Sequence, residues 1–329
     1  VFYLTEPPTD WQVPRDWRRL PGEPPRRLTP ELIVAVRMAY YRRSIVLELD
    51  PDASQSPLVG STEPATRATD LAARARDILG VTLEAQYGWD AEHDSLNGWM
   101  AALEERGVLV FHFTGVAVKE VRGFSLSERV LPVVGINGHD TVNGRIFTLA
   151  HELGHLMLGE GGSCDLGDAT LPSVSRSETE IYANRFAGAL LVPAAALLSD
   201  PVVSRAGPGT KWEISEIERL AARFRVSREV ILRRLVTLER ADADFYRRKR
   251  AELLALPPRD TEPSSGGPAF ALMVVRNVGK PFARLVLDAY HANSITGPDV
   301  SDYLGAGLQH LPAIEARLSS VQALTGGDL

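Results

Sequence analysis

Cysteine is almost absent from the sequence, since Cys164 provides the single thiol among 329 residues. One cysteine excludes an intramolecular disulfide framework, and it also excludes a zinc site built from several thiolates. This low cysteine content suits a reducing compartment, and we predict a cytoplasmic location.

Long hydrophobic runs are missing as well. The longest apolar stretches, near Val130–Ile136 and Ala189–Leu198, are short, and the second contains Pro193. A membrane-spanning helix needs about 18 or more consecutive apolar residues. We therefore predict that the protein does not associate with a membrane.

The sequence has no excess of basic residues. It contains 36 Lys and Arg against 42 Asp and Glu, for a formal net charge of -6. A protein that wraps nucleic acid is usually basic overall, so any basic surface of this protein must be confined to one region.

Short segments that favour strands lie between segments with helical periodicity. Runs rich in β-branched and aromatic residues predict strands at 108–113, 121–126 and 131–136. Helices are predicted before and after them, which gives an α+β fold with a small sheet. We expect an extended peptide to pair with the sheet edge near 131–136.

Changes in composition divide the chain into five segments. They are an extended proline-rich arm (1–27), a mixed domain (28–200), a helical domain (210–256), a linker (257–268) and a C-terminal helical domain (269–329).

The most informative motif is H-E-x-x-H, at His151-Glu152-Leu153-Gly154-His155 within a predicted helix. Residues four apart project from one helical face, so His151 and His155 can bind the same cation. A catalytic zinc ion needs three protein ligands and an open fourth position for water. We therefore predict a Zn²⁺ site in which Glu152 acts on the water as the general base.

The third ligand has to come from another part of the chain. In a three-histidine site of the metzincin type, the third histidine would stand at the position of Gly161, so that arrangement is absent. Glu180 and Glu178 begin the next predicted helix, and Glu180 shares one helical face with Asn184. Glu180 is the first choice for the third ligand and Glu178 is the second. The alternative is that both carboxylates only stabilise the helix by lying near its partly positive N-terminus.

Two stretches of the sequence carry a resemblance to a known family. They are Arg145–His155, which reads R-I-F-T-L-A-H-E-L-G-H, and Glu180–Pro193, which reads E-I-Y-A-N-R-F-A-G-A-L-L-V-P. In these stretches the chain resembles the ImmA/IrrE family of zinc metallopeptidases, which implies a zincin-like core. The resemblance implies zinc ligands at His151, His155 and Glu180, with Glu152 as general base. Tyr182 stands where the family commonly has a second glutamate.

The resemblance also implies a class of substrate. Such enzymes are cytoplasmic, site-specific endopeptidases that typically cleave a helix-turn-helix repressor and thereby relieve repression of stress-response or mobile-element genes. The expected partner is therefore a helix-turn-helix repressor or an antitoxin. Longer members often carry an N-terminal helix-turn-helix domain of the XRE type, and the start at Val1 suggests the hypothesis that such a domain is missing from this chain.

Two alternatives to a peptidase stay open at this point. One is a regulator that binds DNA or an antitoxin without catalysis, and the other is the toxin of a toxin-antitoxin-like pair. Residues Ile214–Leu238 are typical of a helix-turn-helix, and Lys211–Glu252 holds 12 basic and 8 acidic residues. DNA binding is not favoured, because Arg225 occupies a turn position that often holds glycine and a run of charge is usually a solvated face.

Four further residues are assigned to non-catalytic roles. A histidine within an apolar strand, a histidine in a loop, a lone cysteine and an amphipathic tyrosine are more typical of packing or solvation than of catalysis. They are His112, His139, Cys164 and Tyr182.

Overall fold

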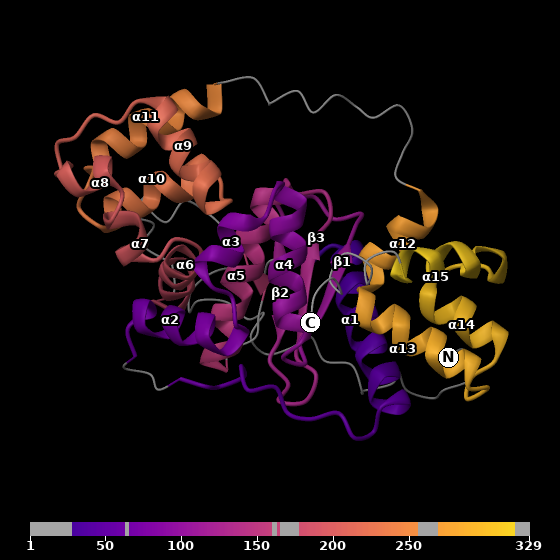
Figure 1. Cartoon of the computed structure of the whole chain (residues 1–329). Coiled ribbons are helices and arrows are strands. Elements are labelled where there is room, and N and C mark those ends of the chain that lie inside the picture. The colour runs from indigo at the N-terminus through magenta and orange to yellow at the C-terminus, as the bar shows by residue number, and fades with distance from the viewer. Residues whose placement is uncertain (1–27, 63–65, 160–162, 165–177, 256–268, 320–329) are drawn as a thin grey trace.

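The computed structural model describes residues 28–62, 66–159, 163–164, 178–255 and 269–319. These residues are mostly helical and contain one small sheet, which confirms the predicted α+β class (Figure 1). Within these ranges no helix is both long and apolar enough to cross a membrane. The predicted arm (1–27) and linker (257–268) lie outside the described residues.

The elements follow one another along the chain in three groups. Ahead of the sheet come α1 (Pro30–Leu49), α2 (Ala68–Leu79), α3 (Leu83–Gly88) and α4 (Glu92–Glu104). The sheet and its adjoining helices are β1 (Leu109–Phe113), β2 (Gly123–Leu126), β3 (Val133–Asn137), α5 (Val142–Leu158), β4 (Ser163–Cys164) and α6 (Glu178–Leu191). The remaining helices are α7 (Ala194–Leu198), α8 (Pro201–Arg205), α9 (Ile214–Phe224), α10 (Arg228–Thr237), α11 (Ala243–Ala255), α12 (Phe270–Val278), α13 (Lys280–His291), α14 (Gly297–Leu304), the 3₁₀ helix η2 (Leu308–His310) and α15 (Leu311–Ser319).

The strand order of the sheet is β1-β3-β2-β4. Strand β3 pairs in parallel with β1 and antiparallel with β2, and β4 pairs antiparallel with β2. The expectation that a peptide pairs with an edge at 131–136 is therefore wrong, because β3 has a neighbour on each side. Its continuous apolar run is typical of a strand that is buried on both faces.

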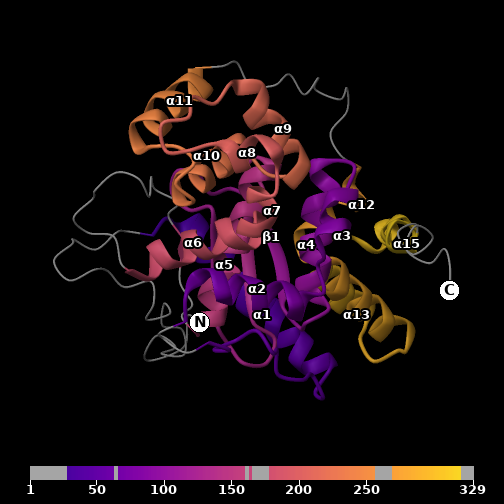
Figure 2. The same cartoon turned by 60° about the vertical axis from the view of Figure 1, so that its left-hand side comes forward.

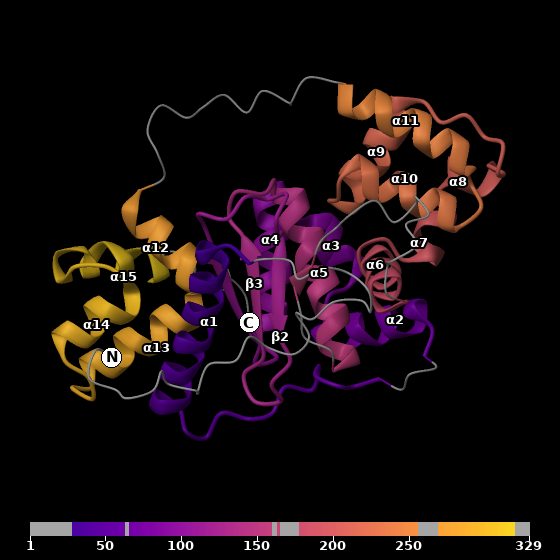
Figure 3. The same ribbon diagram turned by 180° about the vertical axis from the view of Figure 1, so that it is seen from behind.

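Helices pack around the sheet in two separate buried clusters. One cluster joins α2, α4, α5 and α6 to α9, α10 and α11, with Trp99, Leu149 and Phe224 among its members. The other joins α1 to the C-terminal helices α12–α15, through residues such as Val36 and Phe282. Figures 1 and 3 show α12–α15 beside α1, on the opposite side of the molecule from α7–α11. Helix α5, which carries the H-E-x-x-H motif, belongs to the first cluster.

Helices α9 and α10 occupy the segment in which a helix-turn-helix is predicted. Helix α9 ends at Phe224, Arg225 is in the left-handed conformation with φ 54°, and the Ser227 hydroxyl accepts a hydrogen bond from the Val230 N–H at the start of α10. Figure 2 shows α9 and α10 grouped with α8 and α11. Two helices joined by a short turn do not establish a helix-turn-helix domain, so that assignment and the domain boundaries stay predictions.

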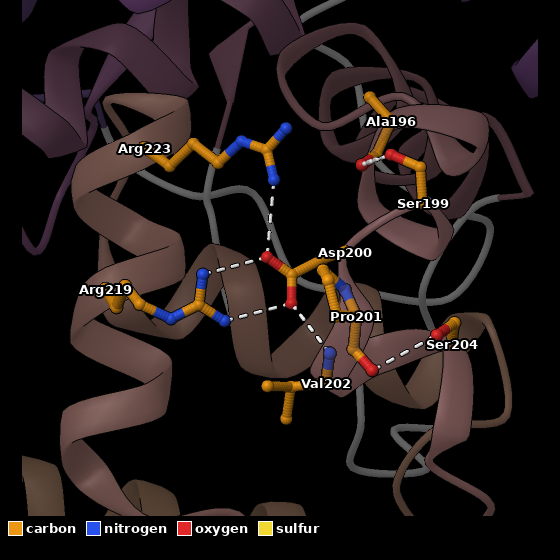
Figure 4. A network of polar contacts seen from close by, with 8 residues as sticks. All are labelled: Ala196, Ser199, Asp200, Pro201, Val202, Ser204, Arg219 and Arg223. Carbon is orange, nitrogen blue, oxygen red and sulfur yellow. Dashed lines mark hydrogen bonds and ion pairs between the residues drawn. The ribbon is translucent and has the colours of Figure 1, made fainter.

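A buried carboxylate fixes α8 to α9 (Figure 4). Asp200 caps α8 by accepting a hydrogen bond from Val202 N at 3.1 Å. It also accepts two bonds from Arg219, at 2.8 and 2.9 Å, and one from Arg223 at 3.3 Å. The hydrogen bonds from Arg219 are the main reason that the pKa of Asp200 is lowered to about 2.

Buried side chains from three other helices hold the C-terminal end of α6. Arg76 of α2, Gln86 of α3 and Arg234 of α10 donate to the carbonyls of residues 190, 191 and 192, at 2.8, 2.9 and 2.8 Å respectively. The last carbonyls of a helix have no partner within the helix, so these donors satisfy them and fix the position of α6.

Candidate metal centre

Helix α5 presents the two histidines of the motif from one buried face. The helix begins at the Thr141 cap, whose hydroxyl accepts from Gly144 N at 3.0 Å. His151 has no exposed surface and His155 is 7% exposed. Gly154 lies where α5 and α6 come close, since a Cβ atom there would be 3.0 Å from Phe186 Cδ1. A glycine at this point lets α6 pack against the motif.

This packing brings the three predicted ligands together. The Nε2 atoms of His151 and His155 are 3.0 Å apart. Glu180 of α6 places Oε2 at 3.3 Å from His151 Nε2 and Oε1 at 3.2 Å from His155 Nε2. One possible ligand atom from each residue lies within 4.8 Å of the others. The Glu180 side chain is 24% exposed, so the group can be reached from solvent.

The spacing and chemistry of these atoms fit a tetrahedral zinc ion. Zinc–nitrogen and zinc–oxygen bonds of about 2.0–2.2 Å at tetrahedral angles place neighbouring ligand atoms about 3.3 Å apart. The two imidazole nitrogens are 3.0 Å apart, and His151 and His155 lie 3.3 and 3.2 Å from the Oε2 and Oε1 atoms of Glu180, respectively. Two imidazoles and one carboxylate also form a recognised catalytic zinc ligand set, with the fourth position left for water.

Lowered pKa values favour the metal-binding forms of His151 and Glu180. Burial lowers the pKa of His151 and so favours the neutral imidazole. Burial by itself raises the pKa of Glu180, but hydrogen bonds to His151 and His155 outweigh it and the net pKa is lowered. A neutral imidazole and an ionised carboxylate are the forms that bind a metal.

Asn184 orients the first of the two imidazoles. Its Oδ1 lies 3.2 Å from His151 Nδ1, and Asn184 is one helical turn beyond Glu180 on α6. A proton on Nδ1, donated to this amide oxygen, leaves the Nε2 lone pair of His151 for a metal.

Glu152 points to a different side of α5, toward the sheet. Its side chain is fully buried, and Oε2 accepts a hydrogen bond from the Ser125 hydroxyl of β2 at 2.8 Å. Glu152 does not belong to the group of three ligand atoms, and the hydrogen bond from Ser125 restricts its rotamer.

The remaining residues that the sequence singled out lie outside the ligand group. Glu178 is exposed at the start of α6. The Tyr182 hydroxyl donates to the carbonyl of Thr66 at 2.9 Å, which is a packing role. His139 Nε2 accepts from the Gly115 N–H at 3.2 Å, within a loop.

Two other singled-out residues belong to the sheet. Cys164 of β4 is paired with Gly123 of β2. His112 of β1 is buried, its Nδ1 lies 2.8 Å from the carbonyl of Arg276, and burial lowers its pKa to about 3, so the ring stays neutral.

Sequence reasoning did not identify the roles of Ser125 and Asn184. Ser125 is a polar residue inside an apolar strand, which is a signal for a buried hydrogen bond, but its partner depends on how the sheet packs on α5. The sequence spacing places Asn184 on the same helical face as Glu180, which indicates its proximity to the site but not its bond to His151.

Comparison with known proteins adds one finding. Residues 103–236 match the family model described as IrrE N-terminal-like domain, peptidase M78. This match confirms the resemblance and indicates a metallopeptidase. No curated protein matches the chain.

Proposed function

We propose that the chain, whose residues 103–236 match the family model described as IrrE N-terminal-like domain, is a zinc-dependent, site-specific endopeptidase. The observation that carries the proposal is the convergence of His151, His155 and Glu180 at separations that suit zinc. Glu152 stands next to His151 in the chain, in the position of the general base of the H-E-x-x-H motif.

Each residue of the site has a distinct role in this proposal. His151, His155 and Glu180 would hold the zinc ion, and Asn184 would keep His151 in the correct tautomer. Bound zinc would polarise the scissile carbonyl and lower the pKa of a water molecule to about 7.

Glu152 would move the proton during hydrolysis. Its carboxylate takes a proton from the attacking water and then gives a proton to the nitrogen of the leaving amine. The hydrogen bond from Ser125 to Oε2 restricts the side chain during both transfers, so a single rotamer serves both.

We propose that the substrate is a cytoplasmic regulatory protein, either a helix-turn-helix repressor or an antitoxin, whose cleavage relieves repression. The match of residues 103–236 to the IrrE N-terminal-like model supports this class of substrate. A regulator without catalysis and a toxin are the competing functions, and both make predictions that differ from those of a peptidase.

The test uses the full chain loaded with zinc and a candidate helix-turn-helix repressor or antitoxin from the same genome. We expect about one zinc per chain and cleavage of the repressor at one bond. Glu152→Gln should keep zinc and abolish cleavage, whereas Glu180→Ala should lose zinc. Glu178→Gln is the matched control, because it removes an exposed carboxylate from the same helix and should change neither property.

Three outcomes would contradict the proposal. Normal cleavage by Glu152→Gln would refute the general base. Zinc-loaded protein that binds the repressor and leaves it intact would indicate a regulator without catalysis. Growth arrest on expression that depends on Glu152, with the repressor uncleaved, would indicate a toxin.

A further inference from the structure

A groove lies at the C-terminal end of α6, where α2, α3, α7 and α10 meet that helix (Figure 1). Its volume is about 630 Å³, which is within the range of roughly 300–1,000 Å³ that is typical of pockets for small molecules. At about 1.5 Å of rise per residue, the end of α6 lies roughly 16 Å along the helix from Glu180. The groove is therefore separate from the candidate metal centre.

Most of the groove wall is apolar. Val81 and Leu83 lie at the junction of α2 and α3, and Pro193 follows α6. Alanines of α2, α6 and α7 form much of the remaining wall. Removal of apolar surface from water is favourable, so this wall favours the hydrocarbon part of a ligand.

Two buried arginines also line the groove. Arg76 of α2 is 9% exposed and Arg234 of α10 is 4% exposed. Neither forms an ion pair with a carboxylate among the described residues, and the one carboxylate in this part of the wall, that of Asp77, is exposed. Burial lowers the pKa of both guanidinium groups, that of Arg234 to about 10, because nearby negative charge does not offset the loss of water.

Both arginines have donors that the described residues do not use. Arg234 donates from Nε alone, to the carbonyl of Val192 at 2.8 Å, which leaves Nη1 and Nη2. Arg76 donates from Nη1 to Gln86 and to the carbonyl of Leu190, while its buried Nη2 has no partner in the part of the chain that the structure describes. The two terminal nitrogens of a guanidinium suit the two oxygens of a carboxylate.

Fixing the end of α6 does not in itself require two positive charges. Gln86 donates to the carbonyl of Leu191 at 2.9 Å with a neutral amide. The C-terminus of a helix carries about half of a negative charge, which offsets only part of the charge on Arg76 and Arg234. A buried charge without an ionised partner is unfavourable, and a carboxylate bound in the groove would supply that partner.

We propose that this groove binds a small molecule that combines one carboxylate with a hydrocarbon chain, such as a fatty acid. The carboxylate would lie against the guanidinium of Arg234, with Arg76 adding positive potential, and the chain would lie along the apolar wall. At about 30 Å³ per water molecule, the volume corresponds to roughly twenty non-hydrogen atoms, which accommodates a chain of about ten carbons. This inference does not depend on the proposed peptidase function.

Isothermal titration calorimetry on the full chain tests the proposal with two probes. Decanoate carries the carboxylate, and 1-decanol has the same chain without the charge. We expect about one decanoate to bind per chain, and 1-decanol to bind at least about tenfold more weakly, because hydrogen bonds to a charged acceptor are the stronger ones. Inorganic phosphate should not displace decanoate at equal concentration, since it cannot use the apolar wall.

Variants show whether binding occurs in the groove. Arg234→Gln and Arg76→Gln should each weaken decanoate binding about tenfold and leave 1-decanol binding unchanged, a difference that a loss of structure would not produce. Arg74→Gln is the matched control, because it removes an exposed charge from α2 outside the wall. Ala195→Trp fills the groove from an exposed position and should weaken both probes, whereas Ala101→Trp on α4 lies outside the wall and should affect neither.

Three outcomes would overturn the proposal. Equal affinities for decanoate and 1-decanol would show that the arginines do not recognise the carboxylate. Decanoate binding that both arginine variants and Ala195→Trp retain would place the ligand elsewhere. Displacement of decanoate by equimolar phosphate would indicate a simple anion site. Circular dichroism identifies any variant that fails to fold, and Ala195→Trp, which keeps both arginines, still tests the position of the ligand.

Discussion

Replacement of Asp200 by Asn tests how strongly one buried carboxylate stabilises the fold. The Asp200 side chain is 1% exposed and receives four hydrogen bonds, from Arg219, Arg223 and the backbone of Val202 (Figure 4). Asn keeps an oxygen that can cap α8 but removes the charge that both arginines neutralise. The loss of stability should therefore come mainly from the ion pairs.

The expected magnitude follows from the pKa of Asp200. A fall in this pKa from 3.8 to about 2 corresponds to about 2 kcal/mol in favour of the ionised form in the folded protein. Arg219 and Arg223 are 48% and 38% exposed, so water compensates part of their lost interaction in the variant. We expect the substitution to lower the free energy of unfolding by about 1–2 kcal/mol at pH 7.

The pH dependence has a defined sign. Because the pKa of Asp200 is lower in the folded state, the unfolded chain takes up a proton first as the pH falls. The stabilisation is complete above about pH 4 and disappears as the pH approaches about 2. Wild type and Asp200→Asn should therefore differ at pH 7 and converge in acid.

Urea denaturation followed by circular dichroism measures this difference at several pH values. The midpoint should fall in the variant while the slope stays unchanged. Asp244→Asn is the matched control, because the Asp244 side chain is 68% exposed. This substitution should change the free energy of unfolding by less than about 0.5 kcal/mol. Equal midpoints for Asp200→Asn and wild type at pH 7, or a difference that persists undiminished near pH 2, would refute the reasoning.

Three further predictions concern the metal centre. Ser125→Ala removes the hydrogen bond to Glu152 and should lower kcat about tenfold with unchanged zinc content, measured by steady-state kinetics and atomic absorption. Asn184→Ala removes the acceptor for His151 and should weaken zinc binding about 10- to 100-fold in a chelator competition, whereas unchanged affinity would exclude an orienting role. Gly154→Ala adds a methyl group where α5 meets α6 and should destabilise the protein by about 1 kcal/mol in urea, despite the better helix propensity of alanine; a more stable variant would contradict the close packing.

The convergence of His151, His155 and Glu180 could be predicted from the sequence because its determinants are mostly local. Helical periodicity places His151 and His155 on one face, and the same rule selected Glu180 over Glu178. The structure brings these three residues together. A site composed of two helices that follow each other in the chain needs little knowledge of the rest of the fold.

The features that could not be predicted depend on packing between distant segments. Strand β3 lies between β1 and β2 in the sheet. The apolar run that predicts this strand does not specify which strands pair with it. The bond from Ser125 to Glu152 depends on how β2 lies against α5, and the groove lined by Arg76 and Arg234 requires α2, α6 and α10 to meet. Neither arrangement leaves a periodic signal in the sequence.

The donors that hold the C-terminal end of α6 have a practical consequence for truncation. Arg234, which binds one of those carbonyls, and Phe224, whose own carbonyl accepts from Gln86 at 2.6 Å, both lie beyond residue 200. A fragment that stops at residue 200 would lack the α10 side chains that pack against α6, the helix that carries Glu180. It would also lack the hydrogen bond from Arg234 to the carbonyl of residue 192. A minimal recombinant enzyme should therefore extend through α11, even though every side chain proposed to bind zinc lies before residue 181.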